Sequence, residues 1–206
     1  MIQTYQSLLK RVGVPQQSRP ELFVDNKALA KAQDTLEKKG VVSSDFLIGI
    51  NPFAAYGLAK CWPIERYRSL LEKLDKETNI KTVVFGDTSH MGQAEKLCDG
   101  LRAINLAGKT SLSDLKAFIS LCHLFVTNDS GPMHIASALN IPVLAIFGST
   151  CPTTTGPYGD YIEVVQKKTS CSPCFKRECP IDFRCMKNIG IEEIYQRVIN
   201  YKDVVL

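Results

Sequence analysis

Short apolar runs alternate with amphipathic segments along most of this chain. The runs are too short for helices, and they predict buried β-strands over 46–50, 81–85, 104–106, 124–127 and 141–147, with an edge strand over 161–166. Between them, apolar residues recur at the three- and four-residue spacing of a helix, which predicts helices over 26–39, 63–76, 90–101, 111–122, 132–140 and 191–201. The pattern therefore predicts strands and helices in alternation.

Strands that are apolar throughout and separated by helices require a parallel sheet that is covered on both faces. Right-handed crossovers then give an α/β fold with a Rossmann-like doubly wound parallel sheet, in which ligands bind at the carboxyl ends of the strands. We expect residues 26–206 to form one such domain. A short helix over 1–9 and a linker that contains Pro15 and Pro20 make up the preceding segment, 1–25.

Composition narrows the class of protein. With 206 residues, 45% of them hydrophobic, the chain is long enough to bury a core. Its 25 basic and 21 acidic residues give a net charge of +4 without a basic run, which argues against nucleic acid as a partner and suits a small anion. Since there is no apolar run long enough to span a bilayer and no signal peptide, we expect a cytoplasmic protein. A GxGxxG motif is missing, which argues against a dinucleotide oxidoreductase.

One candidate binding loop, 128–134, joins a predicted strand to a predicted helix. Asp129 and Ser130 are residue types that cap helices, and Gly131 suits the tight turn into the first helical turn. Such a loop presents unpaired N–H groups and the positive end of a helix dipole, which together suit phosphate. A structural alternative stays open here: the two polar residues only cap the helix, and His134 is a partly buried histidine.

A second candidate loop, 51–63, follows the first predicted strand. Its small residues let the backbone approach a ligand, and Lys60 stands shortly before a helix predicted from Pro63. A lysine at a helix N-terminus suits a diphosphate, because each charge-assisted hydrogen bond contributes about 1.5 to 3 kcal/mol. For this lysine alone, a solvated position on the surface is the alternative. In a parallel sheet both loops lie at the same edge, which favours one shared site.

The motif Lys60-x-Trp62-Pro63 and the run 128–134 have the spacing and order found in the C-terminal, nucleotide-sugar-binding domain of glycosyltransferase family nine. The chain resembles this family, the lipopolysaccharide heptosyltransferases, and within it the heptosyltransferase II subgroup. The resemblance implies one half of a two-domain GT-B enzyme. Such an enzyme transfers heptose from ADP-L-glycero-D-manno-heptose to the inner core of lipopolysaccharide with inversion, and it needs no cofactor.

The same resemblance implies that the N-terminal, acceptor-binding domain is absent from this chain. That domain would carry the catalytic base and bind the lipopolysaccharide core. We therefore expect no catalytic residue here, and little transfer by the chain alone. The resemblance also implies an enzyme of the cytoplasm, in peripheral association with the inner face of the inner membrane.

The donor-binding residues that the resemblance implies are Ala55, Tyr56, Gly57, Lys60, Asp87, Thr110, Asp129, Ser130, Gly131 and His134. Among them, Lys60 is implied to contact the diphosphate and Asp129 the heptose hydroxyls, while the helix start at 130–134 receives the phosphates. The small loop 55–57 is implied to touch the phosphates as well. The remaining two residues are implied to lie near the adenosine.

A cysteine loop, residues 171–185, contains thiols in the order C-x2-C-x4-C-x5-C, at Cys171, Cys174, Cys179 and Cys185. Tetrahedral zinc takes four thiolates, and an iron–sulfur site would use the same ligands. The alternatives are a reduced cluster that only shapes its loop, or disulfides formed after purification. We expect the loop-shaping role and no bound metal.

Two other functions stay open at this point. The first is a two-domain transferase or epimerase that uses a UDP-sugar, which nucleotide preference would separate from the family above. The second is a non-catalytic binding module whose cysteine loop docks a partner.

Overall fold

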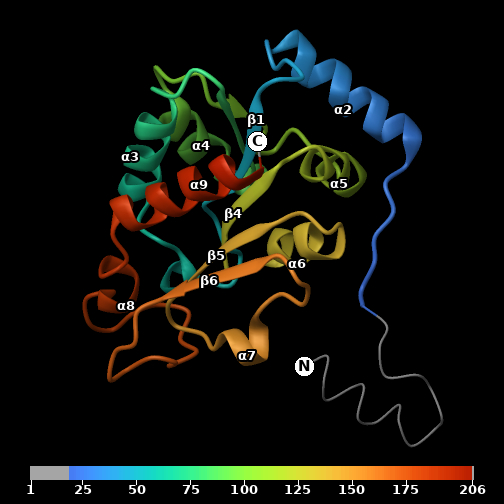
Figure 1. Ribbon diagram of the computed structural model, residues 1–206. Helices are drawn as coiled ribbons and strands as arrows, with labels where there is room; N and C mark the ends of the chain where they lie inside the picture. The colour runs from blue at the N-terminus through green and yellow to red at the C-terminus, as the bar shows by residue number, and fades with distance from the viewer. Residues whose placement is uncertain (1–18, 206) are drawn as a thin grey trace, which may run out of the picture.

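A parallel β-sheet with helices on both faces makes up residues 19–205, the part of the chain that the computed structural model describes (Figure 1). The helix predicted over 1–9 lies outside those residues. The strands are β1 (Phe46–Asn51), β2 (Ile80–Val84), β3 (Ile104–Asn105), β4 (Leu124–Asn128), β5 (Val143–Phe147) and β6 (Ile162–Gln166). They pair in the order β3-β2-β1-β4-β5-β6, and every pair is parallel. Every predicted strand is present, and β6 lies at an edge as expected.

This strand order is that of a doubly wound, Rossmann-like sheet, which confirms the predicted fold class. The chain winds in opposite directions from the neighbouring strands β1 and β4, so the loops after these strands part at the carboxyl edge and leave room for a ligand. The strands end in register, with Asn51 of β1 beside Thr127 of β4. The reversal point therefore indicates where a site should lie.

The longer helices lie where they were predicted, with shifts of a few residues at their ends: α2 (Asn26–Lys38), α3 (Ile64–Leu74), α4 (Met91–Cys98), α5 (Leu112–Ser120), α6 (Gly131–Ala138) and α9 (Ile191–Val205). The structure adds short helical turns that were not predicted: η1 (Leu58–Lys60), η2 (Thr88–His90), α7 (Pro152–Thr155) and α8 (Arg184–Lys187). A turn this short has no repeating apolar pattern, which is why periodicity does not reveal it.

The helix ends follow their capping residues. Asp25 accepts hydrogen bonds from the first amides of α2, and Ser111 and Asp114 form a capping box at the start of α5. Gly40 follows α2 with a φ of 78°, a left-handed conformation that glycine adopts without strain. Lys31 of α2 pairs with Asp114 at 2.8 Å, which joins the two helices on one face of the sheet.

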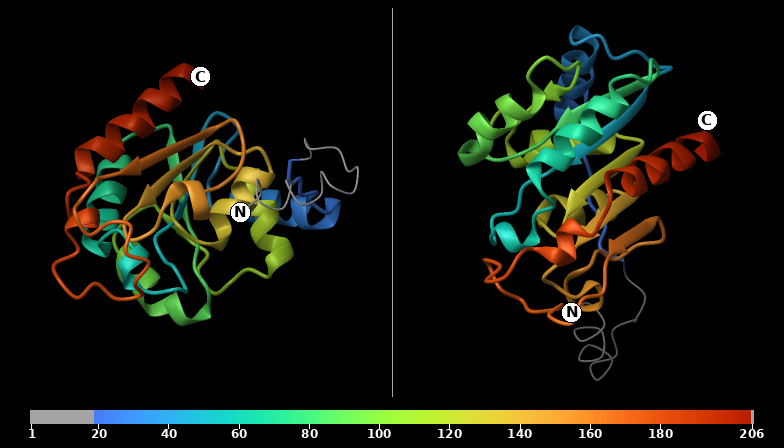
Figure 2. Two further views of the ribbon diagram at one scale, coloured as in Figure 1. Left: turned by 90° about the horizontal axis from the view of Figure 1, so that it is seen from below. Right: turned by 90° about the vertical axis from the view of Figure 1, so that its left-hand side faces the viewer.

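Each face of the sheet has its own hydrophobic core. One core packs α3, α4 and α9 against the sheet and contains Trp62 and Tyr67. The other packs α2, α5 and α6 and contains Phe125 and Phe147. Figure 2 shows these two helical layers on either side of the strands. Burial of both faces supplies the main driving force for this fold.

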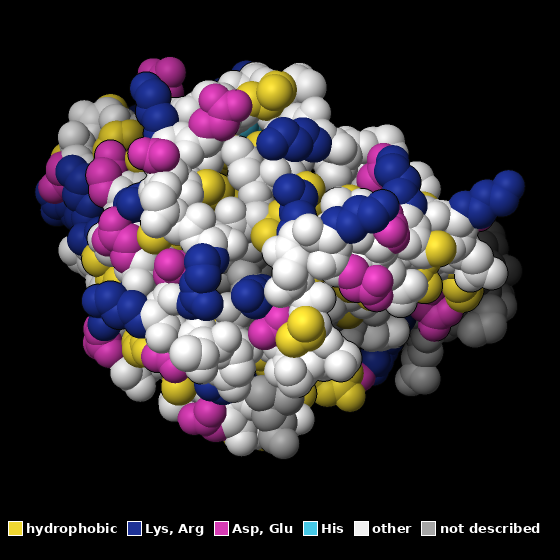
Figure 3. Space-filling model, turned by 90° about the horizontal axis from the view of Figure 1, so that it is seen from above, with side chains coloured by type: hydrophobic (Ala, Val, Ile, Leu, Met, Phe, Trp, Pro, Cys, Tyr) yellow, Lys and Arg dark blue, Asp and Glu magenta, His cyan; other side chains and the backbone are white. Residues whose placement is uncertain are grey.

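The surface carries charges of both signs. Figure 3 shows Lys and Arg side chains interspersed with Asp and Glu over the face it displays, in keeping with the small net charge of +4. Among the helices of residues 19–205, none combines the length and the apolar character that crossing a membrane requires.

A buried asparagine at the end of β4, Asn128, fixes the lysine loop (residues 52–62) that follows β1. Its Oδ1 accepts hydrogen bonds from the backbone N–H of Trp62 and from the hydroxyl of Tyr67, both at 3.0 Å. Its Nδ2 donates to the carbonyl of Pro52 at 2.7 Å. Because Asn128 is fully buried, water does not replace these partners. The asparagine therefore ties both ends of the lysine loop to β4.

We expect Asn128→Ala to lower the free energy of unfolding by about 3 kcal/mol, because it leaves two buried donors and a buried acceptor unpaired. Urea denaturation followed by circular dichroism measures this change. Asn79→Ala is the matched control, because Asn79 is exposed and its loss should change the free energy by less than about 0.5 kcal/mol. Equally small effects of the two substitutions would contradict the role given to Asn128.

Candidate functional site

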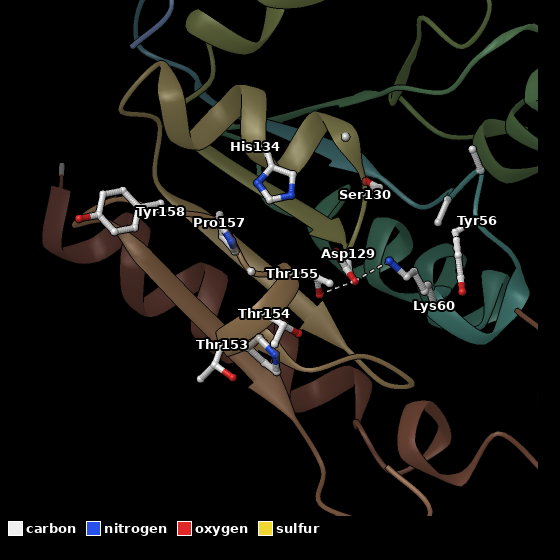
Figure 4. Close-up of a pocket in the computed structure, with 15 residues that line it drawn as sticks. Tyr56, Lys60, Asp129, Ser130, His134, Thr153, Thr154, Thr155, Pro157 and Tyr158 are labelled. Atoms are coloured by element: carbon white, nitrogen blue, oxygen red, sulfur yellow. Dashed lines mark hydrogen bonds and ion pairs between the residues drawn. The ribbon is translucent and has the colours of Figure 1, made fainter. Parts of the chain in front are cut away.

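A cavity of about 650 Å³ opens at the carboxyl edge of the sheet, between the loops that follow β1, β4 and β5 (Figure 4). Its lining residues are Ala54, Ala55, Tyr56, Lys60, Asp129, Ser130, Gly131, His134, Pro152, Thr153, Thr154, Thr155, Gly156, Pro157 and Tyr158. The cavity thus lies at the reversal point of the strand order, where a doubly wound sheet binds its ligands.

An ion pair joins two walls of this cavity. Lys60 Nζ, from η1, lies 2.7 Å from Oδ2 of Asp129, which follows β4 (Figure 4). Only 12% of the Lys60 side chain and 4% of the Asp129 side chain are exposed, so both charges are largely withdrawn from water. The hydroxyl of Thr155 donates to the same carboxylate oxygen at 2.9 Å. The alternative of a solvated surface position for Lys60 is therefore wrong.

The first turn of α6 carries no side-chain cap. Ser130 occupies the N-cap position, but its Oγ accepts a hydrogen bond from Asn51 Nδ2 at 2.8 Å and makes none to the helix. Asp129 pairs with Lys60 instead, so the alternative in which Asp129 and Ser130 only cap this helix is wrong. Apart from its chain neighbours and the backbone of its own helix, no atom of the described residues lies within 4 Å of the position that a Cβ on Gly131 would take. The open backbone and the positive end of the helix dipole can therefore receive an anion.

His134 lines the cavity from α6, and its lowered pKa favours the neutral imidazole at neutral pH. Burial lowers the pKa of this imidazole below its ordinary value of 6.5; the Asp129 carboxylate opposes the shift and the Lys60 ammonium adds to it. Among the lining residues, Lys60 then supplies the positive side-chain charge, and Asp129 balances it. A diphosphate here would meet one ammonium and the helix amides, not a cluster of cations.

The cavity brings together most of the residues singled out from the sequence: Ala55, Tyr56, Lys60, Asp129, Ser130, Gly131 and His134. The other predicted residues, Gly57, Asp87 and Thr110, do not line it. Asp87 instead caps η2, where its carboxylate accepts hydrogen bonds from the hydroxyl and the backbone N–H of Ser89 at 2.5 and 2.8 Å. The hydroxyl contact is the main cause that lowers the pKa of Asp87.

Gly57 lets the cysteine loop pack against the lysine loop. It has a φ of 149°, and a side chain there would overlap the backbone of Arg177. The amide of Ala59 donates to the Arg177 carbonyl at 2.9 Å, and the hydroxyl of Tyr56 donates to the carbonyl of Phe175 at 3.0 Å. The cysteine loop therefore supports the segment that carries the cavity's lysine.

The thiols of the cysteine loop share a second cavity of about 70 Å³, which Cys171, Cys174, Cys179 and Cys185 line. All of them are free thiols. Within residues 19–205, no three His, Cys, Asp or Glu side chains form a group that could hold a metal ion. The cysteines are thus gathered in one place, without a metal-binding arrangement.

One wall of the cavity, residues 152–158, was not predicted from the sequence; it follows β5 and contains α7. A signal was present in Thr153, Thr154 and Thr155, a run of hydroxyl side chains shortly after a buried strand. Because β5 pairs with β4, the segments after these two strands lie side by side at the carboxyl edge. These hydroxyls therefore belong to the same site as Asp129.

Comparison with known sequences assigns this chain to a family. The sequence profile of Glycosyltransferase family 9 (heptosyltransferase) matches residues 1–183. Lipooligosaccharide heptosyltransferase 2 of Campylobacter jejuni (serotype O:2) is 32% identical over 166 residues, which are 75% of this chain and 50% of that protein. The chain spans about half the length of the curated relatives it matches.

Solved structures agree with the sequence comparison. The structure of Escherichia coli ADP-heptose lipopolysaccharide heptosyltransferase II superposes with a TM-score of 0.76 at 27% identity, covering 91% of this chain and 55% of that one. A glycosyl transferase family 9 protein of Veillonella parvula superposes with a TM-score of 0.80 at 25% identity, covering 95% and 57%. Since the family profile covers most of the chain and these folds superpose on it, the chain belongs to glycosyltransferase family 9.

Proposed function

We propose that this chain is the donor-binding domain of a heptosyltransferase II-like enzyme. Such an enzyme transfers heptose from ADP-L-glycero-D-manno-heptose to the inner core of lipopolysaccharide with inversion. The observation that carries the proposal is the cavity where Lys60, Asp129 and the uncapped start of α6 meet. Its volume of about 650 Å³ suits a nucleotide sugar, because small-molecule pockets hold roughly 300 to 1,000 Å³.

In this proposal the diphosphate lies against the first turn of α6. Negative charge grows on the departing ADP as its bond to the sugar breaks. The Lys60 ammonium and the helix end are fixed in place before the reaction, so they stabilise that charge without rearranging. Lys60 lies 2.7 Å from Asp129 and lines the same cavity as Ser130 and Gly131, so a phosphate bound there would share the ammonium with the carboxylate.

Asp129 suits the sugar better than it suits proton abstraction. Its carboxylate accepts hydrogen bonds and already has Lys60 and Thr155 as partners on Oδ2. A base for inverting transfer must instead reach the hydroxyl of the acceptor. We therefore assign the catalytic base and the lipopolysaccharide acceptor site to a second domain outside this chain.

We further propose that the enzyme acts in the cytoplasm, at the inner face of the inner membrane. The lipopolysaccharide core acceptor is attached to a lipid, so transfer to it takes place next to a membrane surface. The net charge of +4 gives a weak attraction to acidic headgroups.

We expect Lys60→Ala to weaken ADP binding about 10- to 100-fold, because a charge-assisted hydrogen bond contributes about 1.5 to 3 kcal/mol. Isothermal titration calorimetry measures the dissociation constant. Lys38→Ala is the matched control, since the Lys38 side chain on α2 is 74% exposed and forms only a surface ion pair, so its loss should change the affinity less than about twofold. Unchanged affinity in a Lys60→Ala chain that circular dichroism shows to be folded would contradict the proposal.

The same calorimetry with different nucleotides tests the donor class. We expect ADP to bind at least about tenfold more tightly than UDP, because a pocket that pairs with adenine leaves polar groups unpaired beside uracil. A preference for UDP would favour the UDP-sugar transferase or epimerase. Binding of neither nucleotide would favour the non-catalytic binding module.

A further inference from the structure

We propose that Thr155 is a positioning residue for the sugar part of the donor, and that it acts by holding the Asp129 carboxylate in place. This inference rests on the proposed function, because it concerns the sugar side of the same cavity. It assigns a role to the wall 152–158, and it identifies the hydroxyl-rich glycosyl group of a nucleoside diphosphate sugar as the ligand of that wall.

Thr155 lies at the end of α7 and faces Asp129 across the cavity (Figure 4). The close-up shows Asp129 between two partners, with Lys60 on one side and Thr155 on the other. The first partner comes from the lysine loop after β1, and the second comes from the segment after β5. The carboxylate is therefore held by segments that are far apart in the sequence.

The hydrogen bonds around α7 direct the Thr155 hydroxyl to Asp129. A hydroxyl has one hydrogen to donate, and two acceptors lie within reach: Asp129 Oδ2 at 2.9 Å and the Cys151 carbonyl at 3.3 Å. That carbonyl already accepts from the backbone N–H groups of Thr154 and Thr155, both at 3.0 Å, which occupies its two lone pairs. The contact to the carboxylate is shorter and charge-assisted, so the hydrogen goes to Asp129.

The ion pair with Lys60 and the hydrogen bond from Thr155 end on the same oxygen of Asp129, Oδ2. Among residues 19–205, no group donates to Oδ1. Fixing Oδ2 from two sides fixes the plane of the carboxylate and presents Oδ1 to a ligand. A carboxylate only accepts hydrogen bonds, so its complement is a group that donates them, such as a sugar hydroxyl.

Lys60 alone would hold this orientation poorly once a donor is bound. Its ammonium is attracted to the diphosphate as well as to Asp129, and its side chain has a flexible stem. Thr155 is a short, β-branched side chain with few rotamers, so its hydroxyl stays in place. The threonine therefore keeps the carboxylate oriented while the lysine is shared with the phosphates.

Calorimetry with ADP and with ADP-heptose tests this role, because only the second ligand carries a sugar. We expect Thr155→Val to change the dissociation constant of ADP less than about twofold and to weaken ADP-heptose about tenfold, as loss of a hydrogen bond to a charged group does. Thr155→Ser keeps the hydroxyl and should restore ADP-heptose binding to within about threefold of the unsubstituted chain. Thr35→Val is the matched control, because the Thr35 hydroxyl on α2 donates to the carbonyl of Lys31, far from the cavity.

A threonine that only stabilised α7 would give a different result. Thr155→Val would then weaken the binding of both ligands equally, or of neither. Either outcome would overturn the positioning role. The proposed function would still be supported as long as the unsubstituted chain binds ADP. Binding of neither ligand by the unsubstituted chain would refute the proposed function, and this inference with it. Urea denaturation of each variant separates a loss of affinity from a loss of folding.

Discussion

A buried ion pair between Lys60 and Asp129 is the interaction on which the site depends. Withdrawing two charges from water is unfavourable, and their attraction offsets that cost only where the geometry is good and further hydrogen bonds are present. Here the pair joins the loops after β1 and β4 at the reversal point of the sheet, and Thr155 supplies the further hydrogen bond. A buried ion pair is weak evidence for stability, and in the proposed function its two charges serve recognition, the ammonium for a phosphate and the carboxylate for a sugar.

Buried amide side chains hold the loops after β1 and β4 in place relative to each other. Asn128 holds both ends of the lysine loop, and Asn51 donates to the hydroxyl of Ser130 at 2.8 Å. That hydroxyl makes no hydrogen bond to the amides of α6. A helix start without a cap leaves backbone donors unpaired, which is unfavourable in a purely structural helix and useful where an anion binds. The start of α6 therefore departs from the usual capping of helix ends, and such departures are expected at functional sites.

Much of this arrangement could be predicted from the sequence. Continuous apolar strands required a parallel sheet covered on both faces, and that topology brings Lys60 and Asp129 to one edge. Capping rules consider only near neighbours in the chain, so they missed that distant side chains, Lys60 and Asn51, engage Asp129 and Ser130. The wall 152–158 was missed because a single helical turn has no periodicity, and its hydroxyls acquire a role only beside a carboxylate from another strand.

The most direct test of this account is a crystal structure of the chain with ADP bound. We predict that the phosphates lie against the backbone N–H groups at Ser130 and Gly131, with a phosphate oxygen within hydrogen-bond distance of Lys60 Nζ and Thr155 still bonded to Asp129. ADP bound elsewhere on the chain, with the Lys60–Asp129 pair unshared and the first turn of α6 facing solvent, would contradict the account.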